Sequence, residues 1–130
     1  MGTVKQFEDL EIWQEARRLA KEILQIVKTT DLNNDFRFRD QIKASSGSVM
    51  DNIAEGFERS GNLEFRQFLS IAKGSAGEVR SQLYRAYDSE YIDEDRLNDL
   101  TVSYVNLSKR ISAFISYLNK KDYKGIKYKE

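Results

Sequence analysis

The chain has 130 residues, contains no cysteine, histidine or proline, and carries a formal net charge of zero at pH 7. The missing cysteines exclude disulfides and thiolate chemistry. The missing histidines remove the commonest general base and the commonest metal ligand. A net charge of zero gives no overall electrostatic attraction to nucleic acid. Since no long apolar run occurs, we predict neither a signal peptide nor a membrane span, and expect a cytoplasmic location.

The first predicted helix runs from about Asp9 to Thr30, with Asp9 as its N-cap. Apolar residues recur at helical spacing along one face. A second face is polar and consists of Gln14, Arg17, Lys21, Gln25 and Lys28. The pattern is typical of an amphipathic helix with one face in a core.

The second predicted helix runs from about Phe36 to Arg59, after a polar loop at Asp31–Asp35. Its apolar stripe consists of Ile42, Ser46, Val49, Ile53 and Phe57. Gly61 is well placed to end this helix.

The third predicted helix runs from about Leu63 to Tyr87 with Asn62 as its N-cap, and the fourth from about Glu94 to Leu118 with Asp93 as its N-cap. Both carry apolar stripes at three- and four-residue steps. No segment alternates as a strand does.

Each predicted helix has ~22–25 residues and would be roughly 35 Å long. Short connections force neighbouring helices to run antiparallel, which predicts an all-α, up-down-up-down four-helix bundle over residues 1–118. Residues 119–130 form a lysine-rich tail, expected to be mobile. Such a tail is either a solubilising end or a functional extension.

Two runs of small residues flank the break between the second and third helices. Folding the two sides back on each other brings Gly47 near Gly74, Ser46 near Ser75 and Ala44 near Gly77. Small side chains let helix backbones approach closely. We therefore predict that Gly47, Gly74 and Gly77 pack the two helices together at their middles.

A polar stripe follows the second helix beside its apolar face. It contains Ser48, Asn52, Glu55 and Arg59, with Gly56 and Phe57 beside it. Asn52 is a weak helix former that would normally stand at a cap. The stripe is either a solvated face or a contact to a ligand or another subunit; candidate interface residues are Asn52, Glu55, Phe57 and Arg59.

A basic stripe follows the third helix, where Arg66, Lys73 and Arg80 stand seven residues apart. Lys43 and Arg85 are expected nearby. Such a stripe either tracks phosphates or is the wet side of the helix. These five residues are the candidate nucleic-acid contacts.

No catalytic or cofactor site is predicted. Glu55, Glu58, Glu64 and Glu78 cluster near the second and third helices, but a di-iron bundle pairs glutamate with histidine, which this chain lacks. Intrahelical ion pairs such as Glu55 with Arg59 account better for these carboxylates. We expect no enzyme, metal or cofactor here.

Several motifs together resemble one family over about residues 7–118. They are Phe7-x-x-Leu10-x-x-Trp13, Gln41-Ile42 with Ala44 and Ser48, Asn52-Ile53-Ala54-Glu55-Gly56-Phe57, Glu64-Phe65-x-x-Phe68-Leu69, Ile71-Ala72-x-Gly74-Ser75, Glu78 with Gln82, and Tyr91-Ile92. The chain resembles the four-helix-bundle proteins encoded in intervening sequences of bacterial 23S ribosomal RNA genes. Where that family usually has a proline after the first helix, this chain has Asp31-Leu32-Asn33.

The resemblance implies a fold and an assembly rather than a reaction. The family resembles the accessory variability determinant of diversity-generating retroelements, a pentameric bundle that binds nucleic acid and a reverse transcriptase. The resemblance thus implies a homo-oligomer, a pentamer, with an accessory role on RNA or DNA and with a reverse-transcriptase-like protein as a further partner. A structural adapter that binds only protein is the alternative.

Overall fold

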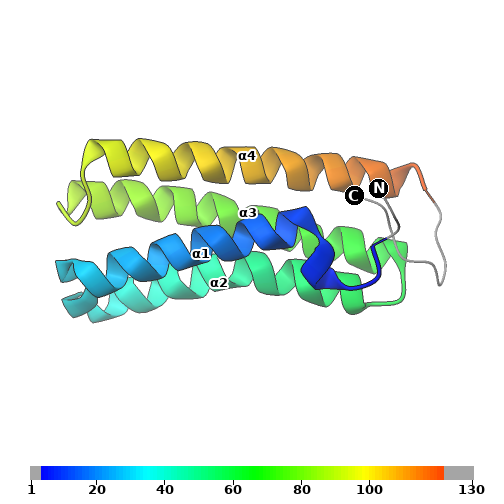
Figure 1. Cartoon of the computed structure of the whole chain (residues 1–130), viewed down its shortest axis with the longest axis horizontal. Coiled ribbons are helices and arrows are strands. Elements are labelled where there is room, and N and C mark those ends of the chain that lie inside the picture. The colour runs from blue at the N-terminus through cyan, green and yellow to red at the C-terminus, as the bar shows by residue number, and fades with distance from the viewer. Residues whose placement is uncertain (1–3, 122–130) are drawn as a thin grey trace.

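The structure, a computed structural model, describes residues 4–121. Four long helices lie side by side and alternate in direction, so that α1 begins and α4 ends at the same end of the bundle (Figure 1). Helix α3 packs between α2 and α4, and α1 closes the bundle against the same two helices. The predicted all-α antiparallel four-helix bundle is confirmed.

The helices match the predicted segments to within a few residues. Their bounds, with those of two short 3-10 helices, are η1 Phe7–Asp9, α1 Glu11–Thr29, η2 Asp31–Asn34, α2 Phe36–Glu58, α3 Asn62–Asp88 and α4 Glu94–Asn119. Helix α4 thus ends one residue beyond the predicted limit of the bundle. Most of the predicted tail, from Asp122 onward, lies outside the described residues. No helix within residues 4–121 is long and apolar enough to cross a membrane.

One of the three predicted caps is confirmed. Asp93 accepts a hydrogen bond from the backbone N–H of Arg96 at 2.8 Å and begins α4. Asp9 instead lies in η1, and Leu10 takes the N-cap position of α1.

Asn62 is the first residue of α3 rather than its N-cap, which is Gly61. Its amide nitrogen donates to the carbonyl oxygens of Leu118 at 3.0 Å and Lys121 at 2.7 Å. Asn62 therefore joins the start of α3 to the end of α4.

The core is a continuous row of apolar side chains contributed by all four helices. The predicted stripes of α2, α3 and α4 are buried, including Ile42, Val49, Val79 and Ile111. Burial of such stripes is the main stabilising contribution to a bundle of this kind. At one end the core is aromatic, where Phe57 meets Phe65 edge to face with ring centroids 5.9 Å apart.

The predicted glycine contact between α2 and α3 is wrong. A Cβ atom added at Gly47, Gly74 or Gly77 would meet nothing within 4 Å. At the middle of the pair, the hydroxyls of Ser48 and Ser75 instead hydrogen-bond across the helices at 2.9 Å. Since one residue corresponds to about 100° of rotation around a helix, the glycines next to these serines point away from the contact.

The other end of the bundle is tied by a contact between two loops. The hydroxyl of Tyr91, in the turn between α3 and α4, donates to the Asp35 carboxylate at 2.8 Å, just before α2. This hydrogen bond raises the pKa of Tyr91. The Tyr91 ring also packs against the core beside Phe38, so this residue joins the two loops to each other and to the core.

Candidate nucleic-acid interface and subunit contact

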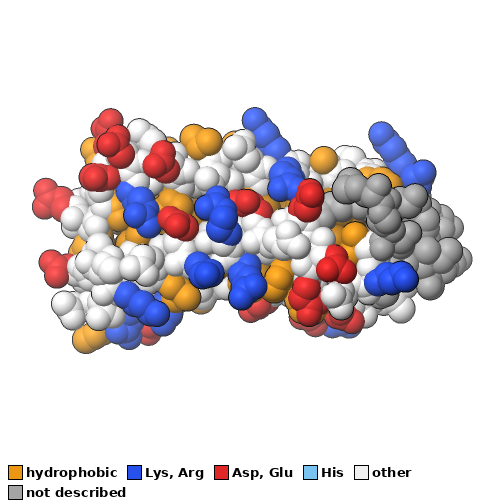
Figure 2. Space-filling model, viewed as in Figure 1, with side chains coloured by type: hydrophobic (Ala, Val, Ile, Leu, Met, Phe, Trp, Pro, Cys, Tyr) orange, Lys and Arg blue, Asp and Glu red, His pale blue; other side chains and the backbone are white. Residues whose placement is uncertain are grey.

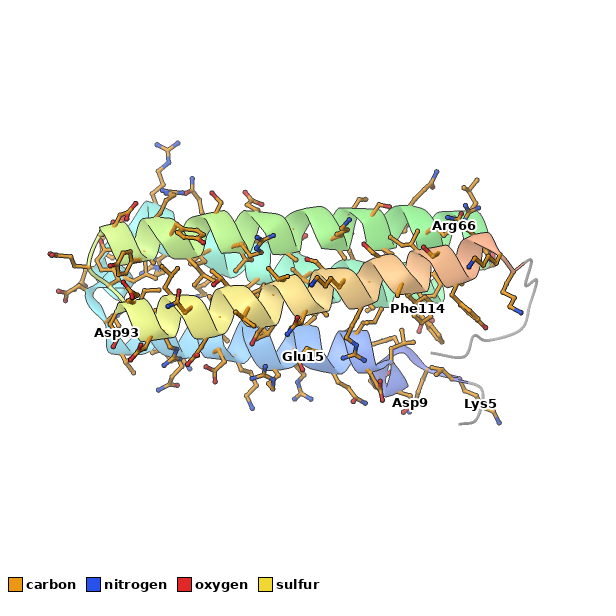
Figure 3. All side chains as sticks on the ribbon, turned by 90° about the horizontal axis from the view of Figure 1, so that it is seen from above. Lys5, Asp9, Glu15, Arg66, Asp93 and Phe114 are labelled. Carbon is orange, nitrogen blue, oxygen red and sulfur yellow. The ribbon has the colours of Figure 1, made fainter. Side chains whose placement is uncertain are left out.

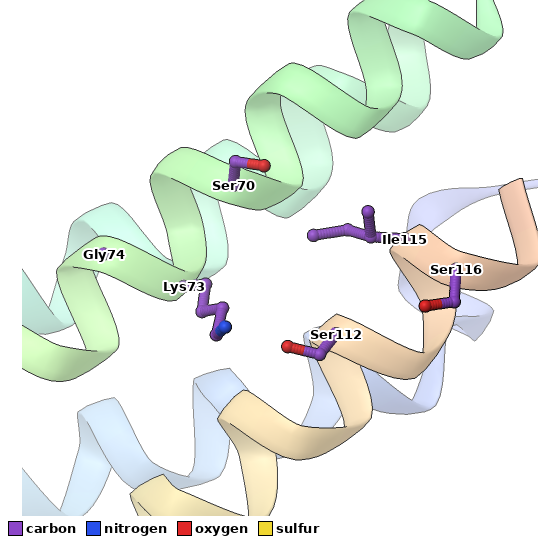
Figure 4. A pocket seen from close by; sticks show the side chains of 6 residues that line it. All are labelled: Ser70, Lys73, Gly74, Ser112, Ile115 and Ser116. Carbon is purple, nitrogen blue, oxygen red and sulfur yellow. The ribbon is translucent and has the colours of Figure 1, made fainter. Parts of the chain in front are cut away.

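The α3–α4 hollow is a depression between helices α3 and α4 with a volume of about 590 Å³. It is lined by Ser70, Lys73, Gly74, Ser112, Ile115 and Ser116. The Lys73 side chain extends from α3 toward Ser112 on α4 (Figure 4). An exposed ammonium group and three hydroxyls give this hollow the donors that a phosphate oxygen accepts.

Arg66 lies on the same side of α3, two turns before Lys73. Its Nε donates to Asn62 Oδ1 at 2.9 Å, and its guanidinium also donates to Asn119 Oδ1. Figure 3 shows Arg66 where α3 begins beside the end of α4. Arg66 is therefore half-buried and bound to α4, so part of its role is structural.

Arg80 continues the basic stripe two turns after Lys73 and is also half-buried. Its Nε is buried and has no hydrogen-bond partner among the described residues. Of the three cations of the stripe, Lys73 is the one whose side chain is exposed.

The two remaining cation candidates do not join this group. The Arg85 guanidinium lies over the ring of Phe38 on α2, 4.3 Å from its centroid, and reaches Gln41 at 3.5 Å. Lys43 is exposed on α2 itself. The five predicted nucleic-acid contacts therefore do not form one group: Arg85 lies on the α2 side of α3, and Lys43 lies on α2.

The polar stripe of α2 is largely engaged within the bundle. Asn52 donates to the backbone carbonyl of Ser48 at 2.8 Å and to its hydroxyl at 2.9 Å, and Ser48 contacts Ser75 on α3. Asn52 is thus a member of a polar link between two helices. This link accounts for an asparagine in the middle of a helix without a second subunit.

Glu55 and Arg59 remain exposed, as a subunit contact requires. Arg59 pairs with Glu55 at 2.8 Å and Glu64 at 3.6 Å, and its guanidinium lies 5.1 Å from the centroid of the Phe68 ring. Phe57, in contrast, is 1% exposed and belongs to the core. The prediction that Phe57 contacts another subunit is wrong, because its position in the apolar stripe of α2 turns it inward.

The charges on the visible surface are mixed. Figure 2 shows acidic side chains gathered at the end that carries the α3–α4 turn, with lysine and arginine interleaved with acids along the middle. Within residues 4–121 no group of three or more acidic side chains is placed to hold a metal ion.

A sequence profile of a known family matches residues 8–113, most of the chain. The family is described as 23S rRNA-intervening sequence protein. The chain belongs to this family.

One solved structure has the same fold as this chain. It is a protein of unknown function from the S23 ribosomal protein family of Bacteroides thetaiotaomicron, with a TM-score of 0.73 and 22% sequence identity. The match covers 81% of this chain and 95% of the other. No curated protein shows significant similarity.

A second depression lies on the opposite flank of α3. The α2–α3 groove has a volume of about 440 Å³ and is lined by Gln41, Ala44, Ser45, Ser48, Glu78, Gln82 and Arg85. Several motif residues that carry the family resemblance, among them Gln41, Ser48, Glu78 and Gln82, come together here.

Sequence reasoning missed the α4 side of the α3–α4 hollow. Ser112 and Ser116 are one turn apart and stand beside the apolar stripe of α4. The spacing of these two serines can be read from the sequence, but which flank of α4 faces Lys73 cannot. The pairing of the two helices supplies that information.

Proposed function

We propose that this protein is a non-enzymatic, oligomeric nucleic-acid-binding accessory protein. The observation that supports the proposal best is the α3–α4 hollow, where Lys73 and three serine hydroxyls form a donor-rich surface flanked by Arg66 and Arg80. Such a surface suits the phosphates of RNA or DNA and reads no base edge. Binding is therefore expected to be largely independent of sequence.

Oligomerisation is part of the proposal, because a single neutral subunit offers few cations. A closed ring repeats the hollow around an axis, and multivalency can raise avidity by ~10²–10⁴-fold when the sites engage together. A pentamer is the ring size that the family resemblance implies. A reverse-transcriptase-like partner rests on that resemblance alone.

An adapter that binds only protein is the second candidate. It is favoured by the zero net charge and by large apolar side chains exposed on the surface, such as Phe36 at 63% and Ile71 at 51%. Isolated exposed apolar residues are common, so this observation is weaker than the donor-rich hollow.

Fluorescence anisotropy with labelled single-stranded RNA tests the proposal. We expect binding at about 50 mM salt that weakens steeply toward about 200 mM, because each neutralised phosphate of a single strand contributes about 0.7 to the log–log slope. Absence of binding at the lower salt concentration for both RNA and DNA would favour the protein-only adapter.

A further inference from the structure

The α2–α3 groove contains a buried polar group without a partner. Gln82 is 4% exposed, and its Oε1 is buried with no hydrogen-bond partner among residues 4–121. Buried polar groups in folded proteins are nearly always paired. Gln82 also lines a surface groove, so a donor that enters the groove and is met by a small shift of the side chain would complete its bonding.

The other groups of the groove define the donor that fits. Glu78 stands one turn before Gln82 on the same face of α3 and is exposed, so a second acceptor lies beside the first. The hydroxyl of Ser45 already donates to the Gln41 carbonyl at 3.0 Å, and Ser48 is bonded to Ser75. The Arg85 guanidinium, the cation of the lining, is engaged with the Phe38 ring and Gln41. The acceptors left over, Gln82 Oε1 and the Glu78 carboxylate, fit a cationic group with several N–H donors, such as a guanidinium or ammonium.

A protein fits this groove better than a nucleic acid does. Glu78 is an exposed carboxylate of the groove with no ion pair among residues 4–121, and its negative charge repels phosphates. Ile71, which is 51% exposed, shares the face of α3 that carries Ser75, Glu78 and Gln82, because these positions are three and four residues apart. An apolar side chain among polar ones is typical of a protein interface.

A matching donor surface is present on the far side of the same molecule. The outer face of α1 carries two amides and three exposed cations, Gln14, Arg17, Lys21, Gln25 and Lys28. In the bundle α1 packs against α2 and α4, whereas α3 lies across from it, so this face points away from the groove. Lysine and arginine side chains along the middle of that side are visible in Figure 2, where α1 lies in front.

We propose that the α2–α3 groove binds the outer face of α1 from a second copy of this chain, with a cation of that face seated against Glu78 and Gln82. Two different surfaces on well-separated sides of one subunit are what a head-to-tail cyclic assembly requires. The inference rests on the oligomer of the proposed function. It assigns one flank of α3 to self-association and leaves the α3–α4 flank for nucleic acid.

Sedimentation velocity over a concentration series, on the full chain and its variants, tests the interface. Gln82→Leu, Glu78→Lys and the triple change R17E/K21E/K28E are each expected to convert the oligomer to monomer, or to raise the concentration needed for assembly at least ~10-fold. Circular dichroism melts check that each variant remains folded. Gln82→Leu is the sharpest of the three, since it removes the unpaired acceptor without changing the charge.

Two control variants should leave the mass unchanged. Tyr104→Phe removes another buried, unpartnered polar atom, and Asp99→Lys reverses an exposed carboxylate on α4. This inference would be overturned if the wild type is an oligomer and its mass is unchanged by Gln82→Leu and Glu78→Lys, or unchanged by the α1 triple change. That result would leave the proposed oligomer intact. A monomeric wild type at all concentrations would overturn the proposed oligomer itself.

Discussion

Gly56 of α2 lies directly against Phe68 of α3. A Cβ atom on Gly56 would stand 2.7 Å from the Cβ of Phe68 and 3.0 Å from a ring carbon of Phe65. Because the Cβ of Phe68 is fixed to its helix, relief of this contact requires the two helices to move apart. The absence of a side chain at Gly56 therefore lets α2 and α3 approach each other closely at this position.

The first prediction compares two helical glycines. Gly56→Ala should lower the free energy of unfolding, because overpacking of about 1–3 kcal/mol exceeds the gain of about 1 kcal/mol in helix propensity. Gly74→Ala should raise it by about 0.5–1 kcal/mol, since its Cβ enters open space. Urea denaturation measures both, and equal effects of the two changes would refute the close contact at Gly56.

The second prediction concerns the buried hydroxyl of Tyr104. Tyr104 is 0% exposed, its hydroxyl has no hydrogen-bond partner within the described chain, and burial raises its pKa above the ordinary value. Tyr104→Phe should therefore be neutral or stabilising at neutral pH, since it removes an unsatisfied polar group.

The pH dependence of this variant has a definite sign. Above about pH 10 the unfolded wild type releases the Tyr104 proton while the folded protein keeps it, so wild-type stability falls relative to Tyr104→Phe by up to about 1.4 kcal/mol per pH unit. Urea denaturation at about pH 8 and about pH 11 measures the difference. If the difference in free energy of unfolding between the wild type and Tyr104→Phe is the same at both pH values, Tyr104 ionises equally easily in the folded and unfolded states.

The third prediction concerns the α3–α4 hollow. Lys73→Glu should weaken RNA binding and reduce the salt slope by about 0.7 for each phosphate that the variant no longer binds, because Lys73 is the exposed cation of the hollow. Lys5→Glu makes the same charge change at an exposed lysine before α1 and should have a smaller effect. Anisotropy titrations compare the two. Equal weakening in both variants would indicate that net charge rather than the hollow governs binding.

The fourth prediction concerns the contact between the start of α3 and the end of α4. Asn62→Ala removes the two hydrogen bonds to the carbonyls of Leu118 and Lys121, together with the acceptor of Arg66. We expect the free energy of unfolding to fall by about 1–2 kcal/mol. Asn98→Ala, at an exposed position of α4, is the control and should not destabilise. If thermal melts show both variants as stable as the wild type, the link is unimportant.

The fold was predictable from the sequence because each helix repeats its apolar residues at 3.6-residue spacing. Asp93 marked the start of α4 correctly for the same local reason, since a cap depends on its own helix. The pairing of Ser48 with Ser75 lies within two residues of the predicted register. Periodicity and loop length thus determine which helices are neighbours and in which direction they run.

The site was only partly predictable, because it depends on the rotation of each helix. Gly74 and Ser75 are adjacent in sequence but point in directions about 100° apart, and only Ser75 meets α2. The sequence predicts for Phe57 both a place in an apolar stripe and a subunit contact, and the structure buries it in the core. The unpaired acceptor of Gln82 could not be predicted from the sequence, because it depends on which neighbouring side chains donate hydrogen bonds in the folded chain.

The central claim is that this neutral bundle acts on nucleic acid as an oligomer. Sedimentation velocity of the wild-type protein with labelled single-stranded RNA at low salt, with the protein and the RNA detected separately, tests it most directly. The account predicts that the protein sediments as an oligomer and that the RNA moves with it. A protein that sediments as a monomer, or an RNA that sediments as it does alone, would contradict the account.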